Sequence, residues 1–245
     1  TDKQHKEVEP YMDFIEIRSK TIAAAGNLPS FLPSHLNLVK TNSYNNIPCK
    51  VQQGGLPVVI FSHGITGSRH LHQAFFEHLS SHGYIVIALD HSYDSNLTIF
   101  PDGRIADYRS EITGHPDSIN IRKNQIDTRT KDIVFVLNQL TKVHQGKIKS
   151  SLNRRINLNN IAVGVHSYGG ATAIHASKID KRIKSIYDIR IVNTNNHNLI
   201  LFGINTPFAI SRGDILELDS YLQKSLSEIF NAYEIRPKIS PIYKN

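Results

Sequence analysis

Short runs of aliphatic, mostly β-branched residues recur along the chain, with polar or helical stretches between them. Runs of this kind are typical of strands buried on both faces of a parallel sheet, where no position has to face water. They predict strands at residues 57–62, 84–89, 161–164, 183–187 and 206–211.

Between these runs, apolar residues recur at helical spacing and predict helices over about 70–82, 121–143, 171–177 and 215–233. Because strands alternate with helices, the expected fold class is α/β, with a mostly parallel central sheet and helices on both faces. One such core can reach the chain's 245 residues. Since no repeat or linker divides the chain, we expect a single domain over residues 1–245.

Two stretches lack a regular pattern. Residues 1–50 are polar and interrupted by prolines, which predicts an irregular N-terminal segment with one short edge strand at Leu36–Val39. Residues 92–118 are too many for a simple connection, and loops of that length are commonly functional.

The charge and composition of the chain limit the kinds of binding partner that we expect. The net charge of +7 favours anionic ones, such as phospholipid headgroups or nucleic acid. Because the basic residues are scattered and no aromatic RNA-binding signature accompanies them, we expect no nucleic-acid partner and retain contact with a membrane surface. No run of about 18 apolar residues is present to span a bilayer. The single cysteine, Cys49, excludes an internal disulfide.

The most informative segment is Gly164-Val-His-Ser167-Tyr-Gly169, which follows a predicted strand and precedes a helix of small residues. Gly-x-Ser-x-Gly in this context is a nucleophile elbow, a turn so tight that the serine takes a strained backbone conformation. Ser167 is therefore the expected nucleophile of an acyl transfer. Its hydroxyl lies beside a helix N-terminus, whose free N–H groups stabilise an oxyanion.

Two N–H groups are candidates for that oxyanion hole. One belongs to Tyr168, the residue after the serine, and the other to Ile65, where Gly64 allows the chain to turn after an earlier strand. His63 is interpreted as a structural histidine that holds this turn. His166 lies inside the elbow and is expected to point away from the serine hydroxyl, so neither is assigned as the base.

Five segments that occur in order resemble the platelet-activating factor acetylhydrolases of the α/β-hydrolase fold, specifically their bacterial relatives, from about residue 28 to about residue 180. They are Phe61-Ser-His-Gly-Ile-Thr-Gly-Ser-Arg69, Leu79-Ser-Ser-His-Gly-Tyr-Ile-Val86, Asp90-His-Ser-Tyr-Asp94, Phe100-Pro-Asp-Gly103 and Val165-His-Ser-Tyr-Gly-Gly170.

This resemblance implies a secreted or soluble serine esterase that needs no metal or other cofactor. It implies substrates with short or oxidised acyl chains on phospholipids, and small synthetic esters as well. It also implies Ser167 as nucleophile with Ile65 and Tyr168 as oxyanion donors. The compartment stays open, with a secreted or periplasmic location favoured over a cytoplasmic one.

The acidic residue of the catalytic triad does not match the family pattern. In the family, this residue follows the strand after the elbow helix. Asp188 fits if two residues have been deleted there, and it is the acid we favour. Asp214, after the next strand, is the alternative, because most other α/β-hydrolases carry their acid at that point. Its position before a predicted helix also suits a simple N-cap.

The base should follow the acid in the order Ser, Asp, His. His197 is the last histidine of the chain and stands before the last of the strands listed above, and the family's histidine is expected about where the chain stops. Three interpretations remain: a chain truncated at its C-terminal end, a catalytically impaired relative that binds a lipid or a protein, or His197 as an unusual base. The first residue, Thr1, marks either a processed end or the edge of a longer protein. A cutinase or polyester hydrolase would share most of these motifs.

Overall fold

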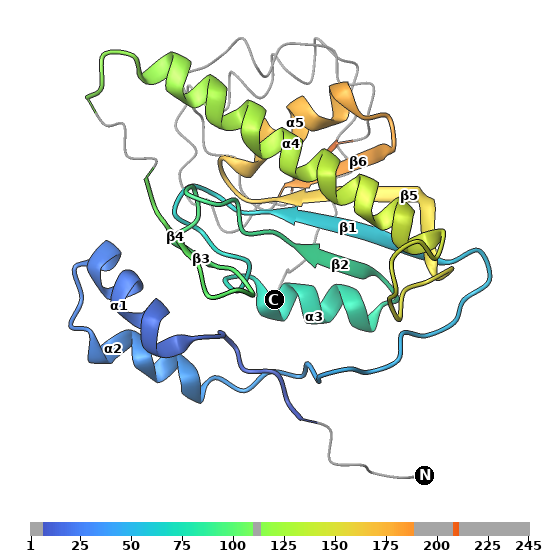
Figure 1. Cartoon of the computed structure of the whole chain (residues 1–245), viewed down its shortest axis with the longest axis horizontal. Coiled ribbons are helices and arrows are strands. Elements are labelled where there is room, and N and C mark those ends of the chain that lie inside the picture. The colour runs from blue at the N-terminus through green and yellow to red at the C-terminus, as the bar shows by residue number, and fades with distance from the viewer. Residues whose placement is uncertain (1–6, 110–113, 189–207, 211–245) are drawn as a thin grey trace, which may run out of the picture.

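A five-stranded parallel sheet forms the centre of the protein in a computed structural model, which describes residues 7–109, 114–188 and 208–210. The strand order is β2-β1-β5-β6-β7, and every neighbouring pair is parallel. The predicted parallel sheet is therefore confirmed (Figure 1). The strands are β1 (Leu56–Ser62), β2 (Ile85–Ala88), β5 (Ile156–Val165), β6 (Ile183–Asp188) and β7 (Phe208–Ile210).

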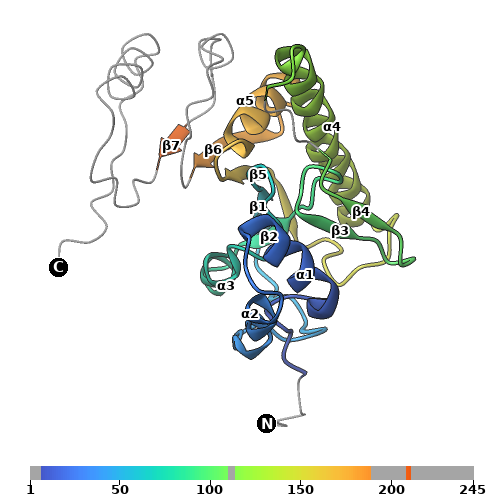
Figure 2. The ribbon, with the colours of Figure 1, turned by 90° about the vertical axis from the view of Figure 1, so that its left-hand side faces the viewer.

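Helices cover both faces of this sheet, as predicted. The long helix α4 (Ser118–His144) and α5 (Gly169–Ile179) lie on one face, and α3 (Gln73–Ser81) lies on the other (Figures 1 and 2). All carboxyl ends of the strands meet at one edge, because every connection returns the chain in the same direction. In folds of this kind, ligands bind at that edge.

Side chains alternate between the two faces of the sheet. Ile60 and Val163 face α4, where Ile133 and Leu137 are also fully buried. On the opposite face, Phe61 packs edge-on against Phe76 of α3, with ring centroids 4.9 Å apart. Truncating a core residue such as Leu137 to alanine typically costs about 2–5 kcal/mol of stability. The core therefore fixes β1 and β5, the strands that lead into the two predicted oxyanion donors.

The prediction of an irregular segment over residues 1–50 was wrong. This part of the chain contains α1 (Ile15–Gly26), the short helix α2 (Phe31–Ser34) and a 3₁₀ helix η1 (His35–Leu38), and η1 occupies the place of the predicted edge strand. Helix α1 was not predicted because it buries polar residues and exposes an apolar one. Its buried residues are Arg18, Ser19 and Ala23, whereas Ile17 is exposed.

Arg18 holds α1 against the rest of the fold. Its guanidinium donates to the Leu97 carbonyl oxygen at 2.6 Å and to the Asp13 carboxylate at 2.7 Å. Burial alone would raise the pKa of Asp13, but its hydrogen bond with His70 and the charges of Arg18 and Arg69 outweigh burial and hold that pKa well below the usual value. This ionic cluster joins α1 to the segment that follows β1.

The stretch 92–118 is also more ordered than predicted. It contains an antiparallel hairpin of β3 (Leu97–Ile99) and β4 (Ile105–Asp107), together with the first residue of α4. The hairpin turns at Gly103, whose φ of 83° lies in the region that favours glycine. None of the helices in the described ranges is both long and apolar enough to cross a membrane. The predicted helix over 215–233 lies outside the described residues.

Candidate active site

Ser167 lies at the turn between β5 and α5, where the elbow was predicted. Its φ is 54°, a left-handed conformation that costs a residue with a side chain about 1–3 kcal/mol. Backbone hydrogen bonds hold the turn, from the Gly169 N–H to the His166 carbonyl at 3.0 Å and from the Gly170 N–H to the Ser167 carbonyl at 2.9 Å. The side chain is only partly buried. Packing thus maintains a strained serine at the carboxyl-terminal edge of the sheet, where folds of this kind usually bind ligands.

The two glycines of the motif allow close packing around this serine. A methyl group at Gly169 would overlap the main-chain carbonyl of Ser62 on β1, and one at Gly164 would lie 3.0 Å from the Phe61 ring. Because backbone cannot move easily, Gly169 excludes a side chain, whereas a side chain at Gly164 would require the Phe61 ring to shift. Contacts with β1 therefore account for the glycines of the Gly-x-Ser-x-Gly pattern.

The turn after β1 approaches the elbow closely. A methyl group at Gly64 would lie 3.1 Å from Ser167 Cβ, so close approach is what requires glycine there. Thr66, two residues later, has a φ of 58°, and its N–H donates to the Asp94 carbonyl oxygen at 3.0 Å. A β-branched residue rarely adopts this conformation. Strained residues thus occur in both segments that were predicted to form the oxyanion hole.

Both predicted oxyanion donors are free of other described partners. No hydrogen bond joins the main-chain N–H of Ile65 or of Tyr168 to another residue in the described ranges. The Tyr168 ring is anchored from α4, because its hydroxyl donates to the Arg122 carbonyl oxygen at 2.9 Å. Burial raises the pKa of Tyr168 to about 12, so the phenol stays neutral. The N–H of Tyr168 therefore stands at the N-terminus of α5 on a fixed residue.

His63 is fully buried and holds the turn, as expected of a structural residue. Its Nε2 accepts from the His91 N–H at 3.0 Å, so its Nδ1 carries the proton and donates to the Gly64 carbonyl oxygen at 2.5 Å. Burial, followed by the charge of Arg129, lowers the pKa of His63 well below the usual value. His166 packs against the His72 ring of the segment leading into α3, with centroids 5.2 Å apart.

A group that sequence reasoning missed lies directly behind the turn. Ser62 Oγ is 2.9 Å from His91 Nε2, and His91 Nδ1 is 2.8 Å from a carboxylate oxygen of Asp132 on α4. Arg129, one helical turn before Asp132, donates to Ser62 Oγ at 3.2 Å and to the His63 carbonyl oxygen. Ser62 ends β1, His91 follows β2, and Arg129 and Asp132 lie on α4. The only signal in the sequence was therefore the polar character of Ser62 and His91 after two buried apolar runs.

The predicted acid and base are less fully described. Asp188 is the last residue of β6, where its backbone is in register with Val165, two residues before Ser167. That register brings the Asp188 backbone to the same edge of the sheet as the elbow, while its side chain lies outside what the structure describes. His197 and Asp214 lie outside the described residues. In the parts of the chain that are described, no group of three or more His, Cys, Asp or Glu is arranged to hold a metal ion.

A sequence model of the family described as platelet-activating factor acetylhydrolase, isoform II, matches residues 19–196. The chain belongs to this family. The match includes the Gly64 turn, His91, α4 and the elbow, but ends before Asp214.

Two curated relatives from this family are platelet-activating factor acetylhydrolases. That of Canis lupus familiaris is 31% identical over 147 residues, which covers 52% of this chain and 33% of the relative. That of Cavia porcellus is 27% identical over 241 residues, covering 87% of this chain and 54% of the relative. The chain therefore spans between one third and about half of the length of these platelet-activating factor acetylhydrolases.

A solved ferulic acid esterase from Streptomyces cinnamoneus has the same architecture. It superposes with a TM-score of 0.67 at 25% identity, covering 95% of this chain and 60% of the esterase. The α/β-hydrolase fold expected for a platelet-activating factor acetylhydrolase relative is thereby confirmed.

Proposed function

We propose that this protein is a serine carboxylic-ester hydrolase that acts on short-acyl or phospholipid-type esters through an acyl-enzyme on Ser167. The observation that carries the proposal is the left-handed φ of 54° at Ser167 beside a helix N-terminus. A fold retains such strain only where the surrounding packing enforces it, and strained residues of this kind cluster at active sites. Family membership and the names of the relatives point to the same reaction class.

The reaction would proceed in two steps. The Ser167 oxygen bonds to the ester carbonyl carbon as its proton passes to the base, and the carbonyl oxygen becomes an anion facing the N–H groups of Ile65 and Tyr168. When this intermediate collapses, the bond to the alcohol breaks and the alcohol takes the proton. Water then releases the acid from Ser167 by the same route. We assign Asp188 as the acid and His197 as the base, with Asp214 as the alternative acid.

A non-catalytic binding protein is the less favoured alternative. Such a protein would have no use for a strained serine or for the adjacent N–H groups that have no partner within the described ranges. A cutinase-type esterase would share this chemistry, and it differs in the substrate that it admits. The names of the family relatives favour a phospholipid-like ester over a polymer.

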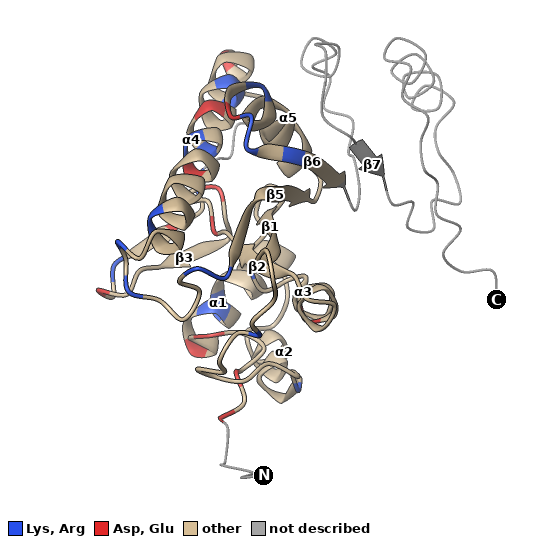
Figure 3. Ribbon diagram, turned by 90° about the vertical axis from the view of Figure 1, so that its right-hand side faces the viewer, with Lys and Arg blue, Asp and Glu red and all other residues tan. Residues whose placement is uncertain are grey.

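Contact with a membrane surface is a further part of the proposal. Large apolar side chains on α2 and η1 are exposed, including Phe31 at 65% and Leu38 at 75%. Lys and Arg are interspersed with Asp and Glu along α4 on the face shown in Figure 3. Insertion of apolar side chains, more than a basic patch, would therefore hold the protein at a lipid surface. Replacing Phe31 and Leu38 by serine should weaken sedimentation with phosphatidylcholine vesicles and leave hydrolysis of soluble esters unchanged.

Hydrolysis of p-nitrophenyl esters of increasing acyl length, and of a phospholipid with a 2-acetyl group, tests the substrate class. We expect the highest kcat/KM with acetyl esters and a fall as the acyl chain lengthens. Equal rates on long-chain esters would contradict the short-acyl assignment. A well-folded protein that cleaves none of these substrates would contradict the esterase assignment.

The acid and base can be assigned by matched variants. If His197 is the base, His197→Ala should lower kcat by several orders of magnitude, whereas alanine at the exposed His35 should not change it. Asp188→Asn should cost more in kcat than Asp214→Asn. The opposite order would move the acid to Asp214.

A further inference from the structure

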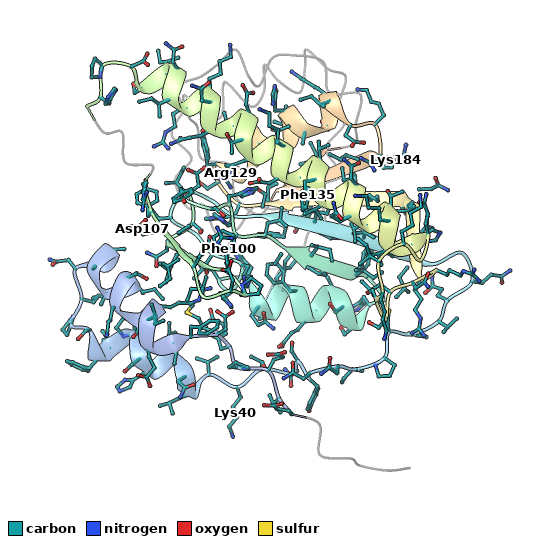
Figure 4. The ribbon with its side chains drawn as sticks, viewed as in Figure 1. Lys40, Phe100, Asp107, Arg129, Phe135 and Lys184 are labelled. Atoms are coloured by element: carbon teal, nitrogen blue, oxygen red, sulfur yellow. The ribbon has the colours of Figure 1, made fainter. Side chains whose placement is uncertain are left out.

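The strongest feature without an assigned role is the buried cation on α4. Arg129 is 1% exposed, and Figure 4 shows it between α4 and the sheet. Burying a guanidinium is unfavourable unless its charge and its donors are matched. Here Nη2 donates to the turn after β1 and the Asp94 carboxylate lies 3.8 Å from Nη1, whereas Nε and Nη1 have no hydrogen-bond partner among the described residues.

Arg129 contacts the oxyanion turn on one side. It donates to the His63 carbonyl oxygen, two residues before Ile65, and to Ser62 Oγ at 3.2 Å. Its other terminal nitrogen is 3.8 Å from the carboxylate of Asp94, whose carbonyl oxygen accepts from the N–H of Thr66. Arg129 therefore holds the main chain immediately before Ile65 and contacts the residue that holds the main chain after it.

Arg129 contacts the elbow on the other side. Its guanidinium lies over the Tyr168 ring, 5.2 Å from the centroid, which is within cation–π range. Arg122 lies over the same ring at 5.4 Å, but its side chain is hydrogen-bonded to Gln125 on its own helix. Of these two arginines, only Arg129 also bonds to the turn after β1.

A chain of hydrogen bonds orients the partners of Arg129. Because the His91 pKa is lowered by burial and then by the charge of Arg129, His91 is neutral and carries one ring proton. That proton is donated from Nδ1 to Asp132, so Nε2 accepts from the Ser62 hydroxyl. The Ser62 oxygen then accepts from Arg129, so the donor and the acceptor of every hydrogen bond in this series are defined.

Although Ser62, His91 and Asp132 have the order of a catalytic triad, they do not form a second active site. Ser62 is 0% exposed at the end of strand β1, so in the described structure its hydroxyl does not reach the surface where an ester could meet it. A nucleophile has to contact the carbonyl carbon that it attacks. The group is suited to orienting neighbours rather than to reacting.

From these contacts we infer that Arg129, oriented by Ser62, His91 and Asp132, is a positioning residue that sets the N–H groups of Ile65 and Tyr168 relative to each other. The inference rests on the proposed function only in that these N–H groups face an oxyanion. Such donors have to be placed before the reaction, because the stabilisation depends on their not having to reorganise. Arg129 is a side chain from outside both segments that contacts each of them.

Arg129→Lys is the direct test, because lysine keeps the charge but cannot form the same pair of bonds. We expect kcat for p-nitrophenyl acetate to fall about 10- to 100-fold with KM within about threefold, as for an interaction made in the transition state. Arg122→Lys, on the same helix and ring, should cost less. Lysine at the exposed Arg104, which also lies over a ring, should cost nothing.

A second measurement does not depend on activity. In ¹H–¹⁵N spectra, Arg129→Lys should shift the amide signals of both Ile65 and Tyr168 more than those of α3, whereas Arg122→Lys should shift Tyr168 alone. Ser62→Ala should reproduce the Ile65 shift if the lysine variant does not fold. Unmoved Ile65 and Tyr168 signals would overturn the inference whatever the activity. Shifted signals in a protein that cleaves no ester would support the positioning and contradict the esterase function.

Discussion

Two serines lie where parallel strands end, Ser62 at the end of β1 and Ser167 two residues after β5. They differ in their hydrogen-bond partners, exposure and backbone conformation. Ser62 has the full set of partners, with His91 Nε2 at 2.9 Å and Asp132 beyond it, but it is completely buried. Ser167 has a strained φ of 54° and partial exposure, and the N–H groups of Ile65 and Tyr168 beside it have no partner in the part of the chain that the structure describes. Its proposed base lies outside the described residues.

In our proposal, a Ser–His–Asp constellation is not sufficient for catalysis here. The buried group has the hydrogen-bond order of a triad, yet in the described part of the chain it is not exposed. The elbow is partly exposed, and the oxyanion site that we propose for it would come from backbone geometry and close packing rather than from side-chain identity. The two regions meet at the Ser62 carbonyl oxygen, which accepts from the His166 N–H at 3.2 Å.

Alanine at each serine should separate the two regions most strongly. Ser167→Ala should lower kcat for p-nitrophenyl acetate by at least about 10³-fold, because the nucleophile is lost. Ser62→Ala should lower it by no more than about tenfold, because only an orienting hydroxyl is lost. Steady-state kinetics on both variants measures the two losses in kcat. Equal losses would contradict the assignment of Ser167 as nucleophile and Ser62 as an orienting residue.

The contact between the two regions should respond to added volume. Gly169→Ala should destabilise the protein by about 3 kcal/mol, since the new methyl group would overlap the Ser62 carbonyl. Gly103→Ala is the matched control. It has a φ of 83° but open space around it, so we expect only the backbone cost of about 1 kcal/mol. Urea unfolding of both variants measures the difference, and equal midpoints would argue against close packing at the elbow.

The smallest effect concerns pH. Burial raises the pKa of Asp132 to about 6 against the opposing charge of Arg129. An unfolded aspartate has a pKa of about 3.9, so this group favours the folded state fully below that pH, and its contribution is lost as the pH rises through 6. The Asp132 side chain is 45% exposed, which keeps the effect on stability small.

Protonation of Asp132 should also reverse the direction of the hydrogen bonds that join Asp132, His91 and Ser62, because a neutral carboxyl donates where the carboxylate accepts. The His91 ring proton would then move from Nδ1 to Nε2 near pH 6. The ¹⁵N shifts of the His91 ring between pH 5 and pH 8 report this change, and Asp132→Asn is the control in which it should not occur. If the His91 tautomer stays the same across this pH range in the unmodified protein, the hydrogen bonds from Ser62 through His91 to Asp132 do not reverse.

The central strands could be predicted because each is a continuous apolar run bounded by polar residues. For example, β1 was predicted at 57–62 and is found at Leu56–Ser62. The start of β5 was missed, because it begins at Ile156 and carries exposed Asn159 and Asn160 before the apolar run. The elbow was predicted from the Gly-x-Ser-x-Gly spacing between an apolar run and a helix of small residues, although the contacts that constrain its glycines come from Ser62 and Phe61 on β1.

Features formed by distant residues could not be predicted. Helix α1 was missed because Arg18, rather than an apolar stripe, is buried in it and bonds across to Leu97. Ser62, His91 and Asp132 carry no common spacing, and they meet only because β1, the segment after β2, and α4 place them together. Such groups become visible when the packing of the elements is known.

Labelling with a fluorophosphonate, followed by mass spectrometry of the modified peptide, tests the central claim most directly. We predict one adduct per chain, on Ser167, which disappears in Ser167→Ala and persists in Ser62→Ala. Absence of an adduct on the well-folded protein, or an adduct that survives in Ser167→Ala, would contradict the assignment of the elbow serine as the nucleophile.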